Sequence, residues 1–180
     1  GRIDDPDGVE GPPGTDAGLG WLPVATSFRG DKVLDRPAGR AVAGPGAGAA
    51  VAGYRIHHGR VTPAAGAAAP WLVGDDGEVL GWHSPAPVAA CGATLHGLFE
   101  RDDFRAAVLA WAAARAGKRW VPGGVDFAAA RTARLDRIAD ALERHLDLDR
   151  LATLIAEAAP VPVTDLVGSQ PHPSPDRRPR

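Results

Sequence analysis

The sequence predicts an α/β domain that is followed by a helical extension. Between residues 19 and 91, short apolar segments with β-branched and aromatic residues alternate with Gly- and Pro-rich turns, which is typical of strands. From residue 101 the pattern changes to apolar side chains at helical spacing. Strands followed by helices, joined by non-local connections, favour a sheet flanked by helices over a pure helical bundle.

The strands are expected in the first half of the chain. Residues 51–57 form the best single strand, because they combine Val, Tyr and Ile. Residues 71–73 and 79–82 flank Gly74-Asp75-Asp76-Gly77, which predicts a β-hairpin. The last strand, at 88–91, is expected to lead into the loop that carries His96. Further strand candidates are residues 19–24, 26–28 and 31–34.

Two low-complexity tracts separate these segments. Residues 44–50 are rich in glycine, but no Gly-Lys-Ser/Thr follows them, so they do not match a phosphate-binding loop. Residues 64–70 are mostly alanine. We interpret both tracts as variable surface loops.

The second half of the chain predicts helices. Residues 101–117 carry Phe104, Val108 and Trp111 at helical spacing and end at Gly117. Asp126 is expected to cap a long helix that ends near His145, and a short helix follows at 149–159. The expected organisation is an α/β domain at 1–117, a helical extension at 118–160 and a disordered Pro- and Arg-rich tail at 161–180.

Composition excludes several classes of protein. The 180 residues carry a net charge of −2, which gives no basic field for nucleic acid. No run approaches the roughly 20 apolar residues of a membrane span, so no membrane partner is expected. The single cysteine, Cys91, excludes an internal disulfide framework and suits a cytoplasmic location.

His96 is the strongest candidate for chemistry. It is expected at the carboxyl end of a strand in Thr94-Leu95-His96-Gly97, where a histidine can face a cleft and transfer protons near neutral pH. A packing or capping role stays open from context alone. Cys91 is expected on a buried strand, as an inert thiol. His57 and His58 are adjacent, so on a strand they point to opposite faces and cannot bind one metal ion together.

Three segments together resemble the cobyric acid synthase family. Gly18-Leu19-Gly20-Trp21-Leu22-Pro23-Val24 is similar to Gly-Leu-Gly-Leu-Leu-Pro-Val of that family. Gly53-Tyr54-Arg55-Ile56-His57-His58-Gly59-Arg60 resembles Gly-Tyr-Glu-Ile-His-x-Gly-Arg. The segment from Gly92 to Arg105 resembles Gly-Thr-Tyr-Leu-His-Gly-Leu-Phe-Glu-x-Asp-x-Phe-Arg. The likeness covers about residues 1–156 in the same order.

The resemblance implies a fold and a reaction. The fold is a class I glutamine amidotransferase-like mixed sheet with flanking helices, truncated at its N-terminus and continued by the helical extension. Such synthases use ATP and glutamine to amidate side-chain carboxylates of adenosylcobyrinic acid a,c-diamide on the route to cobalamin. A cysteine thiolate attacks glutamine, a histidine transfers the proton, and the ammonia reaches a separate ATP-using domain.

The family motif assigns the histidine role to His96. Triad enzymes place an orienting Glu two residues after this histidine, where this sequence has Leu98. The resemblance also implies that the nucleophile segment, Cys-Gly-Gly-x-Gln-x-Leu, precedes Gly1. We therefore expect a C-terminal part of a synthase that is inactive alone and holds no cofactor, with ATP and Mg²⁺ in the N-terminal domain.

Two alternatives remain open from the sequence. The chain could be a non-catalytic interaction module that reuses the fold. It could also be an amidotransferase subunit for another carboxylate substrate, such as a cell-wall lipid, because the segment around His57 does not exclude it.

Overall fold

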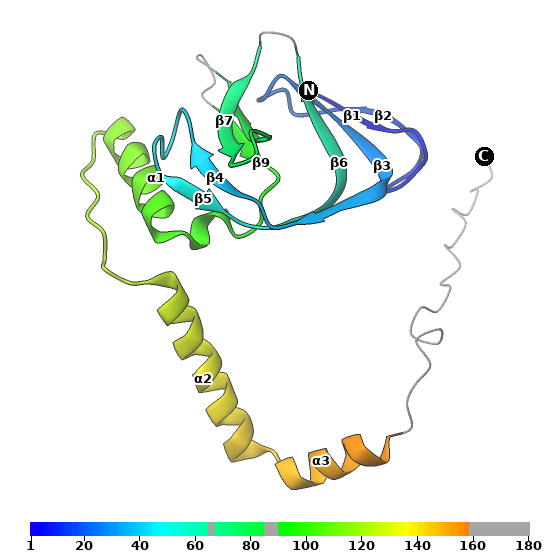
Figure 1. Ribbon diagram of the computed structural model, residues 1–180, viewed down its shortest axis with the longest axis vertical. Coiled ribbons are helices and arrows are strands. Elements are labelled where there is room, and N and C mark those ends of the chain that lie inside the picture. Colours follow the sequence, from blue (N-terminus) through cyan, green and yellow to red (C-terminus); the bar gives the residue numbers. More distant parts are fainter. Residues whose placement is uncertain (65–66, 85–89, 159–180) are drawn as a thin grey trace, which may run out of the picture. The chain divides into compact units, whose positions relative to one another are not determined.

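The computed structural model describes residues 1–64, 67–84 and 90–158. The chain forms two compact units, Gly1–Thr132 and Ala133–Arg180. In the described residues the first unit is a mixed α/β domain with two sheets (Figure 1). The expected boundaries at residues 117 and 160 stay predictions, and the tail at 161–180 lies outside the described residues.

The first sheet has the strand order β2-β1-β3-β6. Its strands are β1 (Arg2–Asp5), β2 (Gly14–Ala17), β3 (Val24–Asp35) and β6 (Arg55–Pro63). β1 runs parallel to β3, whereas the β1–β2 and β3–β6 pairs are antiparallel. This sheet is therefore mixed, as the family resemblance implies, but the described strands divide between two sheets where one was expected.

The second sheet is antiparallel and has the order β5-β4-β7-β8-β9. Its strands are β4 (Ala38–Ala41), β5 (Ala50–Ala52), β7 (Ala69–Gly74), β8 (Val79–His83) and β9 (Cys91–Ala93). The predicted hairpin is confirmed by β7 and β8, and Gly77 in its turn has a φ of 88°. The turn requires a left-handed backbone conformation at position 77, which glycine adopts without strain.

Two strand predictions are wrong. Residues 51–57 do not form one strand: β5 ends at Ala52 and β6 begins at Arg55, and the two strands belong to different sheets. Residues 19–23 form a loop that bends at residues 20–22, and β3 begins only at Val24. Apolar composition alone favoured a strand there, but Gly20 has a φ of 76° and ends extended backbone. The predicted strand at 88–91 lies partly outside the described residues, and β9 begins at Cys91.

The glycine-rich tract at 44–50 forms a loop between β4 and β5, as predicted, but part of it is not at the surface. Pro45 and Gly46 are buried, and the indole N–H of Trp71 donates a 2.8 Å hydrogen bond to the Pro45 carbonyl. A Cβ on Gly46 would lie 2.7 Å from Cε2 of Phe104. Position 46 requires glycine because the chain passes directly against α1 (Asp102–Arg115) there.

The core of the first unit lies between the second sheet and α1, which stands beside β5 in Figure 1. Phe104, Leu72 and Val51 are fully buried, and Val108 packs against the same cluster. α1 begins with Asp102 and Asp103 in its first turn and is followed by Gly117 with a φ of 65°. Acidic residues near the N-terminus and glycine after the C-terminus are the termini that the sequence predicts.

A buried carboxylate organises the loop after β1. Asp5 accepts hydrogen bonds from the backbone N–H groups of Val9, Glu10 and Gly11 at 2.7, 2.9 and 3.0 Å. Burial tends to raise the pKa of Asp5, but these donors outweigh it and keep the pKa below its ordinary value. The loop after β1 is therefore stabilised by hydrogen bonds from its own backbone to Asp5.

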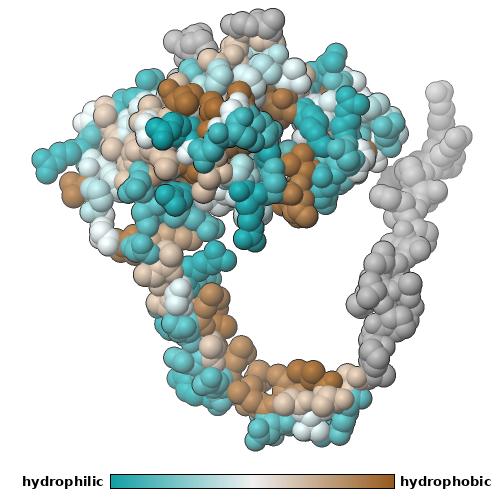
Figure 2. Space-filling model, viewed as in Figure 1, coloured by the Kyte–Doolittle hydropathy of each residue, from teal (hydrophilic) through white to brown (hydrophobic). Residues whose placement is uncertain are grey.

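Two further helices follow α1. Asp126 accepts a 2.7 Å hydrogen bond from the Ala129 N–H at the start of α2 (Phe127–His145), which confirms the predicted cap. Asp147 caps α3 (Leu148–Glu157) in the same way. The apolar side chains of the two helices are exposed and appear as a brown surface in Figure 2: Leu135, Ile138, Leu142, Leu146, Leu151, Leu154 and Ile155. In the part of the chain that the structure describes, no helix is long and apolar enough to span a bilayer.

Candidate active site

His96 lies on the loop that joins β9 to α1, and its side chain is exposed. The residues on either side fix this loop: Leu95 and Leu98 are buried in the core, and Gly97 has a φ of 73°. The buried leucines anchor the backbone while Gly97 turns it. The loop therefore presents the imidazole at the surface from a rigid support.

The backbone of His96 pairs with that of Tyr54. The His96 N–H donates to the Tyr54 carbonyl at 2.8 Å, and the Tyr54 N–H donates to the His96 carbonyl at 3.0 Å. The two rings stack, with 5.0 Å between their centroids and 15° between their planes. Within the described residues neither ring nitrogen of His96 makes a hydrogen bond, so both are open to a reactant.

Gly53 makes this pairing possible. A Cβ at position 53 would lie 2.3 Å from the His96 carbonyl oxygen, far inside van der Waals contact. Only glycine allows the two backbones to approach so closely. The break between β5 and β6 at Gly53 and Tyr54 is thus the point at which the chain contacts the histidine loop.

The position of the orienting acid in triad enzymes is occupied by Leu98, whose side chain is 6% exposed and belongs to the core. It begins the short helix η1 (Leu98–Glu100). The Arg105 guanidinium donates to the Phe99 carbonyl at 2.6 Å and pairs with Asp102, which ties η1 to the first turn of α1. The turn after His96 therefore has a structural role and brings no carboxylate to the imidazole.

Cys91 is partly buried and packs against the core cluster. Burial raises the pKa of its thiol above the ordinary value. A thiol with a raised pKa provides little thiolate at neutral pH and is a poor nucleophile. This environment supports the interpretation of Cys91 as an inert core residue.

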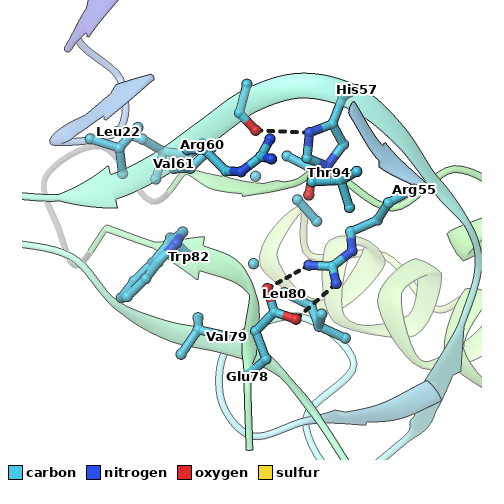
Figure 3. Close-up of a pocket in the computed structure, with 16 residues that line it drawn as sticks. Leu22, Arg55, His57, Arg60, Val61, Glu78, Val79, Leu80, Trp82 and Thr94 are labelled. Carbon is cyan, nitrogen blue, oxygen red and sulfur yellow. Dashed lines mark hydrogen bonds and ion pairs between the residues drawn. The ribbon is translucent and has the colours of Figure 1, made fainter. Parts of the chain in front are cut away.

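A pocket of about 350 Å³ lies between the two sheets of the first unit (Figure 3). β3 and β6 form one wall, and β8 and β9 form the other. Most of its lining is apolar, and its polar side chains include Arg55, His57, Arg60, Glu78 and Thr94.

Arg55 joins the two sheets at one end of this pocket. Its guanidinium makes paired hydrogen bonds with Glu78, at 2.6 and 2.8 Å (Figure 3). It makes a second pair with Asp35, at 2.8 and 2.5 Å. Arg55 is 8% exposed, and the hydrogen bonds and charges of both carboxylates raise its pKa. The hydrogen bond from Arg55 in turn lowers the pKa of Asp35. We refer to Arg55, Asp35 and Glu78 as the Arg55 cluster.

The two adjacent histidines have different partners. His57 Nδ1 lies 2.8 Å from the Gly59 carbonyl oxygen, and His57 lines the pocket. His58 Nδ1 lies 2.9 Å from the Arg29 carbonyl oxygen. Among the described residues no group of three or more His, Cys, Asp or Glu side chains could hold a metal ion. His172 lies outside them.

Sequence reasoning missed the two contacts that organise this region. It did not connect Tyr54 with His96 or Arg55 with the carboxylates of Asp35 and Glu78. A strand interrupted by Gly53 was the available signal, because a glycine inside a strand often marks a close backbone approach.

An exposed histidine on a loop after a strand, in a mixed α/β domain, does not by itself identify a class of protein, and comparison with known proteins defines the class. Residues 1–104 match the family described as the CobB/CobQ-like glutamine amidotransferase domain. This match covers more than half of the chain, and the chain belongs to this family of glutamine amidotransferase domains.

Curated relatives narrow the similarity further. The chain is 47% identical over 154 residues to the cobyric acid synthase of Caulobacter sp. (strain K31), which covers 84% of the chain and 29% of the relative. It is 42% identical over 154 residues to that of Mycobacterium ulcerans (strain Agy99), with 84% of the chain and 27% of the relative. It is 40% identical over 167 residues to that of Nocardia farcinica (strain IFM 10152), with 86% of the chain and 31% of the relative covered. The chain thus spans less than a third of the length of these relatives.

Proposed function

We propose that the chain is the glutamine-hydrolysing part of a cobyric acid synthase, a ligase that forms C–N bonds. The complete enzyme would use ATP and glutamine to amidate side-chain carboxylates of adenosylcobyrinic acid a,c-diamide. The family membership supports glutamine as the nitrogen donor, and the identities of 40–47% to cobyric acid synthases support the corrinoid substrate. A cytoplasmic location follows from the same proposal.

The observation that carries the proposal is the exposed imidazole of His96. It lies on a loop fixed by buried leucines, and both of its ring nitrogens are open. A neutral imidazole accepts a proton and its cation donates one, which are the two tasks of thiol-dependent amide hydrolysis. We assign these tasks to His96 and the nucleophilic thiol to a cysteine outside these 180 residues.

In this mechanism the thiol transfers its proton to His96 as its sulfur bonds to the amide carbon of glutamine. His96 passes the proton to the amide nitrogen, the C–N bond breaks, and ammonia leaves a γ-glutamyl thioester. Water then attacks the thioester, His96 accepts a proton from the water and returns one to the sulfur, and glutamate is released. The 180 residues alone would not hydrolyse glutamine, because His96 would have no thiol to deprotonate.

The second half of the reaction belongs to another part of the enzyme. ATP and Mg²⁺ would activate the corrinoid carboxylate in a nucleotide-binding domain outside this chain, and ammonia would travel there. None of the proton transfers assigned to His96 depends on that domain.

The test uses an extended protein, in which the coding sequence upstream of Gly1 is restored. We expect His96→Asn to reduce glutamine hydrolysis by about 10²–10⁴-fold, which is the usual contribution of general acid–base catalysis. Amidation supplied with free ammonia should stay near the wild-type rate, because it bypasses the thioester. Unchanged glutamine hydrolysis in His96→Asn would remove His96 from the mechanism. Loss of both activities would indicate a folding defect or an interaction module.

A further inference from the structure

The imidazole of His96 is oriented without a carboxylate. In triad enzymes an acid holds the catalytic histidine, but here Leu98 occupies that position and is buried in the core. In the described part of the chain no carboxylate bonds to the His96 ring. Some other group must then restrict the rotation of an exposed side chain about its own bonds.

Tyr54 is the group in position to do this. Its ring lies nearly parallel to the imidazole, at 15°, with 5.0 Å between the centroids. Stacking covers one face of the imidazole and leaves its edge, where both nitrogens are, uncovered. The ring can therefore be held without either nitrogen being occupied by a hydrogen bond.

Two sets of hydrogen bonds hold the backbone around Tyr54. Its backbone makes the paired hydrogen bonds with His96, at 2.8 and 3.0 Å. The next residue, Arg55, is buried and held by Asp35 of the neighbouring strand β3 and by Glu78 of the β7–β8 turn. With both backbones held in this way, the stacked rings of Tyr54 and His96 restrict each other's rotation.

We propose that Tyr54 is a positioning residue for the glutaminase reaction, which takes the place of the orienting acid. This proposal rests on the proposed function of His96. The aromatic ring sets the plane of the imidazole so that its edge faces the incoming thiol and the departing amine. The phenol hydroxyl is not needed for this, because stacking uses the ring alone.

The packing of the domain does not depend on the Tyr54 side chain. This side chain is 46% exposed and is not part of the core cluster, so its removal leaves the packing intact. Leu34 offers a matched control: it lines the same shallow surface pocket as Tyr54 and is 74% exposed.

The experiment compares Tyr54→Ala, Tyr54→Phe and Leu34→Ala in the extended protein. We expect Tyr54→Ala to lower kcat for glutamine hydrolysis by roughly 10- to 100-fold, the usual cost of a misplaced catalytic group, with a smaller change in KM. Tyr54→Phe and Leu34→Ala should both keep the wild-type kcat. Ammonia-dependent amidation should be unchanged in all three.

Nuclear magnetic resonance separates this proposal from the function on which it rests. The ring current of Tyr54 shifts the ring protons of His96, and this shift should disappear in Tyr54→Ala and persist in Tyr54→Phe, whether or not His96 is catalytic. If His96→Asn is inactive while Tyr54→Ala keeps the wild-type kcat, the positioning role is wrong and the proposed function stands. If His96→Asn is fully active, both proposals fail. If Tyr54→Phe is as impaired as Tyr54→Ala, the hydroxyl and not the stack is responsible, which also overturns the proposal.

Discussion

Replacing Gly53 by alanine tests whether the contact between the Tyr54 segment and the His96 loop is as close as described. The added Cβ would lie 2.3 Å from the His96 carbonyl oxygen, whereas ordinary contacts lie at 3.4–4 Å. The loop would have to move by about 1 Å to relieve this overlap. Such a movement breaks one or both of the backbone hydrogen bonds between Tyr54 and His96.

The expected cost follows from those bonds. A backbone hydrogen bond contributes about 0.5–1.5 kcal/mol, so the loss of two costs about 1–3 kcal/mol of local stability. Amide hydrogen exchange measures this directly, because the Tyr54 and His96 N–H groups should exchange roughly 5- to 150-fold faster in Gly53→Ala. In the extended protein, glutamine hydrolysis should also fall by about 10²-fold, because a 1 Å displacement of a catalytic group can lower the rate by that factor.

Gly30→Ala is the matched control for this prediction. A Cβ at Gly30 would meet no atom within 4 Å, and the backbone there has no positive φ. We expect its exchange rates and activity to equal those of the wild type. If Gly53→Ala shows the same protection of the two amides as Gly30→Ala, the close approach does not exist and the reasoning about the histidine loop is wrong.

Three further substitutions test other parts of the structure. Arg55→Ala should lower the stability of the extended protein by about 1–3 kcal/mol, because its charged hydrogen bonds to Asp35 within the first sheet and to Glu78 beside the second sheet are lost. The pKa of Asp35 is lowered in the folded protein, so its interaction with Arg55 contributes stability at pH values above the ordinary aspartate pKa of about 4. This stability is lost as the pH falls through the folded-state pKa. Thermal unfolding should therefore lose this acid dependence in Arg55→Ala, and an unchanged profile would contradict the role of the Arg55 cluster. Cys91→Ala should retain glutamine hydrolysis, since burial raises the pKa of this thiol, and complete loss with a normal melting temperature would make Cys91 the nucleophile. Gly46→Ala should destabilise the protein by about 2–4 kcal/mol, because its Cβ overlaps Phe104 at a φ of 74°, and an unaltered unfolding midpoint would refute the packing of that tract.

Local features of the fold could be predicted from the sequence. The hairpin around Gly77, the cap at Asp126 and the end of α1 before Gly117 all depend on residues within a few positions of one another. Turn chemistry and helix capping act over such short distances, so the residue types alone indicate them. The exposed position of His96 after a strand also agrees with the prediction.

Long-range pairing could not be predicted in the same way. The apolar run at 51–57 reads as one strand, yet Tyr54 leaves it to pair with His96, more than forty positions further along the chain. The glycines of residues 44–50 predict a loop, which the structure has, but not that Gly46 is buried against Phe104. In both cases the reason for the residue lies in a distant segment, which composition and periodicity do not report.

The proposed function requires that the imidazole of His96 faces the thiol of a cysteine outside these 180 residues. A crystal structure of the extended protein would measure the distance between the nearer His96 ring nitrogen and the sulfur of that cysteine. We expect this distance to be within hydrogen-bond reach, roughly 3–4 Å in the free enzyme. A separation of about twice that distance, or an imidazole covered on its edge by other side chains, would contradict it.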